Sequence, residues 1–119
     1  MEIHESGEDY LERILILSQE SGYARSIDIA AALHFSKPSV SVAMKTLRER
    51  GFITMDAESH IRLTESGTVV AERIYDRHRR LTAFLTSLGV SEATAREDAC
   101  KMEHDLSEET YRAICRQVK

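Results

Sequence analysis

The first third of the chain carries apolar residues at every third or fourth position, which is the spacing of one face of an α-helix. Over residues 8–18 this pattern places leucines and isoleucines on one face and leaves the carboxylates of Asp9 and Glu12 together on another. A shorter apolar segment, residues 27–33, follows Ser26, whose hydroxyl is suited to an N-cap. The pattern therefore predicts two helices in succession, the second of them short.

A third helix is predicted over residues 37–50, with Ser36 as its N-cap. Val40, Met44 and Leu47 recur at i, i+4 and i+7, so this face of the helix should turn inward. The opposite face carries small hydroxyls and cations, which suit DNA phosphates and base edges. The predicted DNA-binding residues are Ser36, Lys37, Ser39, Ser41, Val42, Lys45, Thr46 and Arg48. Two short helices joined by a tight turn, the second of this character, form a helix-turn-helix pattern.

Two β-prone runs come next, residues 52–55 and 61–64, and the polar turn between them predicts a β-hairpin. A hairpin directly after a helix-turn-helix is typical of the wing of a winged helix. The combination is much more specific than either part alone. Residues 65–88 then predict a long helix, which Gly89 ends.

Two further helices are predicted after Ser91 and Ser107, each a suitable N-cap. The fold class is therefore mainly α, with an N-terminal winged helix-turn-helix, a small β-hairpin wing and a distal all-helical half. We expect the boundary inside the long helix, between residues 1–73 and residues 74–119. An apolar stripe near the end of that helix predicts a homodimer, because a monomer of this size would have difficulty covering it. The stripe consists of Leu81, Phe84, Leu85 and Leu88.

Charge is unevenly distributed along this chain of 119 residues, whose formal net charge is -4. Residues 37–50 hold four cations against one acid, a local +3. Residues 1–20 hold six acids against one cation, and residues 91–110 hold seven against two, so each segment sums to -5. A basic patch between acidic segments fits DNA at one surface and cations at another, although a single charge run is more often a solvated face.

No apolar run approaches the roughly 18 residues of a membrane span, and the N-terminus lacks the basic start and apolar core of a signal peptide. We therefore expect a cytoplasmic protein without membrane association. The two cysteines, Cys100 and Cys115, are too few for a disulfide framework. In a reducing compartment such thiols are better explained as buried or metal-binding.

A thiol, a carboxylate and an imidazole follow one another at Cys100, Glu103 and His104. On a helix these positions, i, i+3 and i+4, lie within about a quarter turn and offer several ligands to one transition metal. Further candidate ligands are Asp9, Glu12 and His78. Taken singly, Cys100 is more simply a small buried hydrophobe and His104 a solvated helix residue. The metal hypothesis therefore depends on all six residues converging.

The order of these features resembles the DtxR/MntR family of metal-dependent transcriptional repressors over almost the whole chain. The motifs that carry the resemblance are Glu8-Asp9-Tyr10-Leu11-Glu12, Gly22-Tyr23-Ala24-Arg25, Leu63-Thr64-Glu65-Ser66-Gly67, Arg77-His78 and Cys100-Lys101-Met102-Glu103-His104-Asp105-Leu106-Ser107. The resemblance implies a homodimeric repressor that binds a palindromic operator when metal is bound, and that controls metal homeostasis genes. The chain length is similar to that of the short, manganese-responsive branch, which lacks an SH3-like domain.

The resemblance also implies the ligands: Asp9 and Glu12 match the first-helix pair of the manganese branch, and His78, Glu103 and His104 match its other ligands. Cys100 departs from that branch, which carries a bridging glutamate there, whereas the iron-responsive branch carries a cysteine. The expected cofactor is Mn(II) or Fe(II), with one or two ions per subunit. A thiolate moves the preference toward softer or later metals. A cysteine that acts only as a terminal ligand leaves one strong site plus a weak one.

Three other functions compete with this interpretation. One is a winged-helix regulator that senses thiol oxidation or a small ligand through Cys100. Another is a metalloenzyme whose open coordination position activates water. The lack of an obvious substrate cleft in so short a chain argues against it. The third is a constitutive DNA-binding module in which the six residues are structural. We expect a regulator rather than an enzyme.

Overall fold

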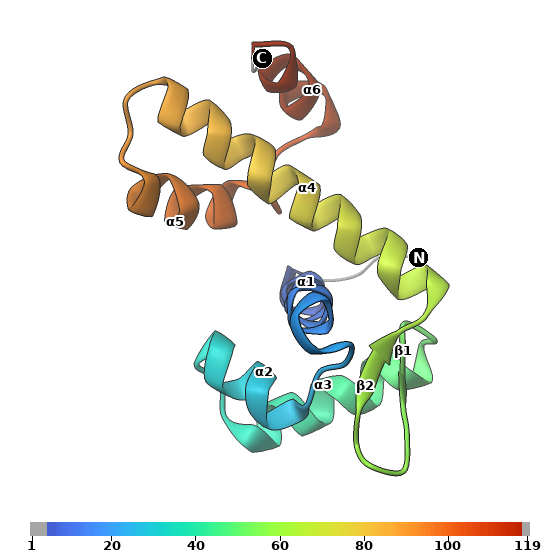
Figure 1. Cartoon of the computed structure of the whole chain (residues 1–119). Coiled ribbons are helices and arrows are strands. Elements are labelled where there is room, and N and C mark those ends of the chain that lie inside the picture. The colour runs from blue at the N-terminus through green and yellow to red at the C-terminus, as the bar shows by residue number, and fades with distance from the viewer. Residues whose placement is uncertain (1–4, 118–119) are drawn as a thin grey trace. The chain divides into compact units, whose positions relative to one another are not determined.

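The computed structural model describes residues 5–117, with side chains from residue 7 onward. Its elements are α1 (Glu5–Ser21), α2 (Ser26–Leu33), α3 (Lys37–Glu49), β1 (Ile53–Met55), β2 (Ile61–Leu63), α4 (Glu65–Ser87), α5 (Glu92–Met102) and α6 (Glu108–Gln117) (Figure 1). They fall into two compact units, residues 1–72 and 73–119, and α4 contributes to both. The predicted class, mainly helical with a small antiparallel hairpin, is confirmed.

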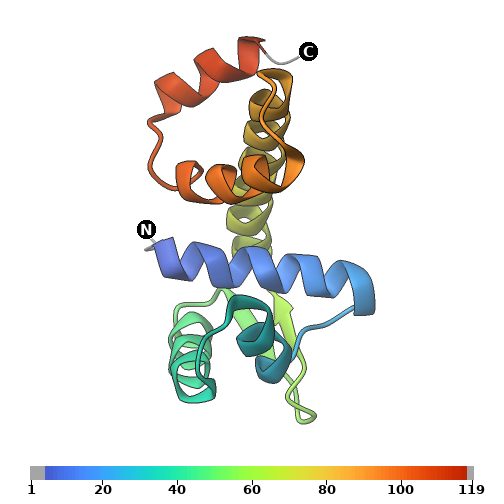
Figure 2. The same ribbon diagram turned by 90° about the vertical axis from the view of Figure 1, so that its left-hand side faces the viewer.

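In the N-terminal unit, α1 lies over α2 and the wing strand β2, and α3 contacts α2 and β1 (Figure 2). Leu11 and Ile14 of α1 are fully buried, which confirms the inward face expected from the sequence. Val40, Met44 and Leu47 of α3 are buried as predicted. Burial of these side chains is the main favourable contribution to the stability of this unit.

The start of α3 follows the sequence prediction. Ser36 has extended backbone angles, its Oγ accepts a hydrogen bond from the backbone N–H of Ser39 at 3.2 Å, and Pro38 lies in the first turn. Proline is tolerated there because the first helical N–H groups have no partner within the helix. The cap therefore fixes where the exposed face of α3 begins.

The predicted N-cap of α2 is wrong. Arg25 occupies the cap position with extended angles (φ -122°, ψ 149°), and Ser26 is already the first helical residue. The cause is the preceding residue: Ala24 exchanges two backbone hydrogen bonds with Ile61 of β2, at 2.9 and 2.7 Å, which keeps this segment extended. At the other end, His34 closes α2 in the left-handed conformation (φ 59°).

The predicted wing is confirmed, with strands slightly shorter than expected. β1 and β2 pair antiparallel, with Ile53 opposite Leu63 and Met55 opposite Ile61. Helix α4 begins directly after the wing, and Gly67 allows its close approach, because a Cβ there would lie 2.0 Å from the carbonyl oxygen of Phe52. Gly67, the last residue of the Leu63-Thr64-Glu65-Ser66-Gly67 motif, is therefore required for the close packing of α4 against the wing.

In the C-terminal unit, α5 and α6 are two short helices that follow α4 (Figure 2). Ser91 and Ser107 accept backbone hydrogen bonds from Thr94 and Thr110, which confirms both predicted caps. Leu81 is fully buried, so one member of the predicted apolar stripe belongs to the core of the protein. None of the described helices combines the length and the apolar character that crossing a membrane requires.

Candidate metal centre and nucleic-acid interface

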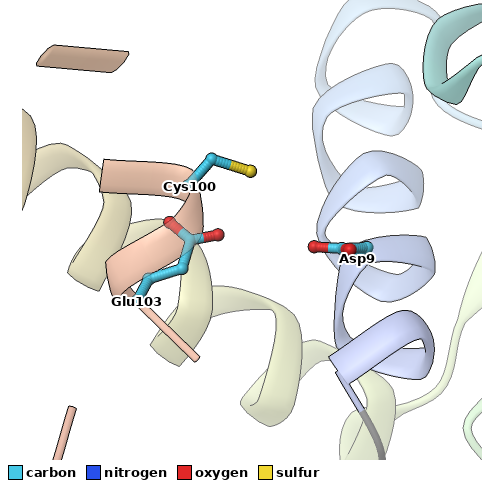
Figure 3. A group of neighbouring side chains, drawn as sticks. All are labelled: Asp9, Cys100 and Glu103. Atoms are coloured by element: carbon cyan, nitrogen blue, oxygen red, sulfur yellow. The ribbon is translucent and has the colours of Figure 1, made fainter. Parts of the chain in front are cut away.

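Asp9 and Glu12 lie one turn apart on α1, and both are half-buried. Figure 3 shows the Asp9 side chain projecting from this helix. Burial raises the pKa of the neighbouring Tyr10 hydroxyl, and the negative charge of Asp9 raises it further. The N-terminal unit therefore presents two carboxylates on one helix face, as the sequence predicts.

Glu103 is the centre of a second group of candidate ligands, in the C-terminal unit. Its Oε2 lies 3.0 Å from Nδ1 of His78 on α4, and its Oε1 lies 3.4 Å from Nε2 of His104. The structure thus brings three of the predicted ligands together, one from the long helix and two from the turn after α5. A carboxylate with an imidazole near each oxygen is a typical set of donors for a divalent transition metal.

The burial of Glu103 tests whether these residues fit a cation. The residue is only 1% exposed, and its Oε1 accepts no hydrogen bond from any residue that the structure describes. Burying a carboxylate oxygen costs free energy unless a donor or a cation compensates it. Buried charges are paired or coordinate metals, so the oxygen, nitrogen and sulfur donors around this position fit a divalent ion.

The helix that carries Cys100 ends before the last two of these ligands. α5 ends at Met102, Glu103 occupies its C-cap with helical angles, and His104 lies in the turn that follows. The Glu103 N–H still donates to the carbonyl of Ala99, so Glu103 keeps its place one turn after Cys100. Only His104 leaves the helical spacing assumed from the sequence.

Cys100 is exposed on α5, so the interpretation of this residue as a small buried hydrophobe is wrong. Figure 3 shows its side chain and that of Glu103 projecting from the C-terminal end of α5. An accessible thiol one turn from a buried carboxylate suits a terminal metal ligand.

All eight predicted DNA-binding residues on and before α3 are exposed, and Val42 is 67% exposed. Three of their hydroxyls have local roles: those of Ser36 and Ser39 bond each other, and the Thr46 hydroxyl donates to the carbonyl of Val42. The cations of α3 are therefore the better candidates for direct contact with DNA.

A hollow of about 560 Å³ lies between the start of α2, α3 and the wing. Its lining is Arg25, Ser26, Ile27, Ser41, Met44, Lys45, Arg48, Met55, Glu58 and Ser59. Of this lining, the sequence predicts Lys45 and Arg48 as DNA-binding residues but not Arg25, which the extended cap segment brings beside the wing. The signal that could have indicated Arg25 is the Gly22-Tyr23-Ala24-Arg25 motif.

Comparison with known proteins identifies the class. Residues 2–61 match the model of the iron dependent repressor N-terminal DNA binding domain, and residues 64–119 match that of the iron dependent repressor metal binding and dimerisation domain. The chain therefore belongs to the iron-dependent repressor family of metal-dependent transcriptional regulators. The resemblance noted in the sequence is confirmed.

Individual relatives agree with this assignment. The transcriptional regulator MntR of Escherichia coli is 42% identical over 107 residues, which cover 90% of this chain and 69% of that protein. A manganese-dependent transcriptional repressor, solved in complex with manganese, is 26% identical with a TM-score of 0.85 and covers 93% of this chain and 52% of its own. IdeR of T. acidophilum is 28% identical with a TM-score of 0.82, and covers 98% and 55%. The chain thus spans about half the length of these solved structures.

Proposed function

We propose that this chain is a metal-responsive repressor that binds a palindromic DNA operator as a homodimer when Mn(II) or Fe(II) is bound, and that it controls metal homeostasis genes. The proposed ligands are Asp9, Glu12, His78, Cys100, Glu103 and His104. The observation that carries the proposal is the buried Glu103 carboxylate, held between two imidazoles with one oxygen outside any described hydrogen bond. Membership of a family whose domains bind DNA and metal supports it.

The proposed ligands belong to two units. Asp9 and Glu12 lie in the N-terminal unit with the winged helix, and the other four lie in the C-terminal unit. Like charges at a shared site repel, so the carboxylates by themselves disfavour any arrangement that brings them together. When bound, a divalent cation supplies the positive charge that allows the ligands of both units to share one site.

This coupling gives the DNA response a physical basis. If metal and DNA both favour the same arrangement of the units, the affinity for metal and the affinity for DNA are linked. Metal then strengthens DNA binding, and DNA strengthens metal binding, by the same factor. In a dimer, the α3 helices of both subunits must reach major grooves about 34 Å apart. A small change in the arrangement of the units is therefore enough to affect DNA binding.

The chemistry of the proposed ligands determines which metal they prefer. Carboxylates and imidazoles suit Mn(II) and Fe(II), whereas a Cys100 thiolate would favour later metals. A thiol must also lose its proton to bind, which makes its contribution dependent on pH. We propose one strong ion site per subunit together with a weaker second site.

DNA binding is assigned to the exposed face of α3. Lys45 and Arg48 line the hollow beside the wing together with Arg25, so three cations face one concave surface. Cations supply the salt-dependent part of DNA affinity, and the neighbouring side chains read base edges. The proposed contacts are Ser36, Lys37, Ser39, Ser41, Val42, Lys45, Thr46 and Arg48.

The proposal includes a cytoplasmic regulator without catalytic activity. Its named relatives are transcriptional regulators, which supports metal sensing over thiol sensing through Cys100. Metal content after chelator-free purification, followed by a gel shift with and without EDTA, tests it. Bound metal together with a shift that EDTA abolishes is expected, whereas a shift unaffected by EDTA would favour a constitutive DNA-binding module.

A further inference from the structure

Arg77 precedes His78 on α4, and its guanidinium contacts the turn that carries two proposed ligands. Nη1 donates to the carbonyl oxygens of Glu103 and Leu106, each at 3.2 Å. Nη2 donates to Oε2 of Glu108, at 2.6 Å. One side chain of α4 therefore contacts the end of α5, the connecting turn and the first residue of α6.

The surroundings of Arg77 hold its side chain in place. The guanidinium carbon lies 4.6 Å from the ring centre of Tyr111, and the side chain is only 12% exposed. Its hydrogen bond to Glu108, assisted by its positive charge, lowers the pKa of that carboxyl, which keeps this partner ionised. A planar guanidinium with several donors in a fixed fork suits this combination of acceptors, which a lysine ammonium cannot reproduce.

We propose that Arg77 is a positioning residue for the metal ligands, because it fixes the turn from which Glu103 and His104 project. The inference rests on the proposed metal function. The last carbonyls of a helix have no partner within the helix, and the Glu103 carbonyl is one of them. Arg77 satisfies that carbonyl, while the adjacent His78 faces the carboxylate of the same residue.

The alternative is a purely structural role, in which Arg77 stabilises the C-terminal unit without affecting ligand geometry. The two roles differ in a measurable way. Residues that orient metal ligands typically change metal affinity by 10–100-fold when they are replaced. A structural residue instead lowers the melting temperature and leaves the metal affinity of the folded protein unchanged.

The test compares Arg77→Gln and Arg77→Lys with the wild-type chain. Arg112→Gln is the matched control, because Arg112 also pairs with Glu108 but is 72% exposed and contacts neither carbonyl. Co(II) affinity is measured by competition with a chelator, well below the melting temperature, and the visible Co(II) spectrum is recorded at full occupancy. We expect Arg77→Gln to bind about 10–100-fold more weakly with an altered spectrum. Arg77→Lys should only partly restore affinity, and Arg112→Gln should match the wild type.

A measurement without metal follows the turn itself. In EDTA, hydrogen exchange at the Glu103 and Leu106 amides should be faster in Arg77→Gln than in Arg112→Gln. Unchanged exchange together with unchanged Co(II) affinity in a folded Arg77→Gln protein would overturn the inference. A wild-type chain that binds no Co(II) would instead overturn the proposed function on which the inference rests.

If Arg77→Gln does not fold, Glu108→Gln decides the matter. Glu108 is exposed, and glutamine at this position removes the negative charge that pairs with the guanidinium. Co(II) affinity a few-fold weaker than in Arg112→Gln is expected. Equal affinities in these two variants would overturn the inference.

Discussion

At the scale of single residues, Lys45 gives the most direct test of the DNA-binding face. It is exposed on α3 and lines the hollow beside the wing. If its ammonium meets a phosphate, Lys45→Ala should weaken DNA binding and reduce the slope of log affinity against log salt by about 1. A salt titration of DNA affinity measures both quantities. Arg116→Ala, on the exposed surface of α6, should leave the slope unchanged, and an unchanged slope in Lys45→Ala would exclude a phosphate contact there.

Cys100 gives the second prediction at this scale. If its thiolate binds metal, Cys100→Glu should favour Mn(II) over Co(II) and Zn(II), and Cys100→Ala should weaken metal activation. The fold should survive both changes, because the side chain is exposed on α5. A Co(II) spectrum decides, since a thiolate ligand adds a charge-transfer band in the near ultraviolet. Absence of that band at full occupancy and neutral pH would mean that the sulfur is not a ligand.

The candidate ligands could be selected from the sequence because their spacing and chemistry are local. Cys100 and Glu103 keep the predicted helical relation, but His104 does not, because α5 ends at Met102. The role of Arg77 could not be predicted. Its acceptors are backbone carbonyls in a turn 26 and 29 residues away, and only the folded chain brings them within reach.

At the scale of elements, the wing turn is organised by Asp56. Its Oδ1 accepts hydrogen bonds from the backbone N–H groups of Glu58 and His60, and its Oδ2 accepts one from Arg62. The His60 ring stacks on Tyr23 at 3.7 Å, next to the cap segment of α2. These contacts connect the wing to the start of the helix-turn-helix.

This arrangement predicts a pH dependence of the wing. The hydrogen bonds from His60 and Arg62 lower the pKa of the Asp56 carboxyl. A carboxyl with a depressed folded pKa stabilises the turn fully above its unfolded pKa, about 3.9, and this stabilisation is lost as pH falls through the folded pKa. Hydrogen-exchange protection of the Glu58 and His60 amides should therefore be high at pH 6 and fall only below about pH 4.

The matched variants are Asp56→Ala and Asp28→Ala, the second an exposed acid on α2. In Asp56→Ala, protection of the two amides should be low already at pH 6 and should no longer depend on pH. Equal protection at pH 6 in Asp56→Ala and the wild type would show that the carboxylate does not organise the turn.

Helix and hairpin positions followed from the sequence because hydrophobic spacing and capping are properties of short segments. The end of α2 nearest the wing did not, because a bridge between Ala24 and Ile61 sets the backbone before it. That pairing joins residues 37 positions apart, and nothing local signals it. A tertiary contact thus overrides the preference of Ser26 for the N-cap position.

At the scale of the whole molecule, we predict a homodimer formed through the C-terminal unit. Leu88 is 64% exposed beside half-buried Phe84 and Leu85, whereas Leu81 is buried and excluded from the interface. Leu88→Asp should weaken self-association at least about tenfold, or roughly 1.4 kcal/mol, because a buried charge replaces an apolar contact. Sedimentation at micromolar concentration measures this. Ala83→Asp, at an exposed position of α4, is the control. A monomeric wild type with and without metal would refute the dimer.

The proposed coupling between metal binding and DNA binding also belongs to this scale, because its proposed ligands come from both units. Its most direct test is fluorescence anisotropy on a palindromic duplex, selected from random DNA in the presence of Mn(II). We expect DNA affinity to be roughly 5–150-fold higher in Mn(II) than in EDTA. His78→Ala, with its ligand removed, should bind equally weakly in both. Equal wild-type affinity in Mn(II) and EDTA would contradict metal-dependent DNA binding.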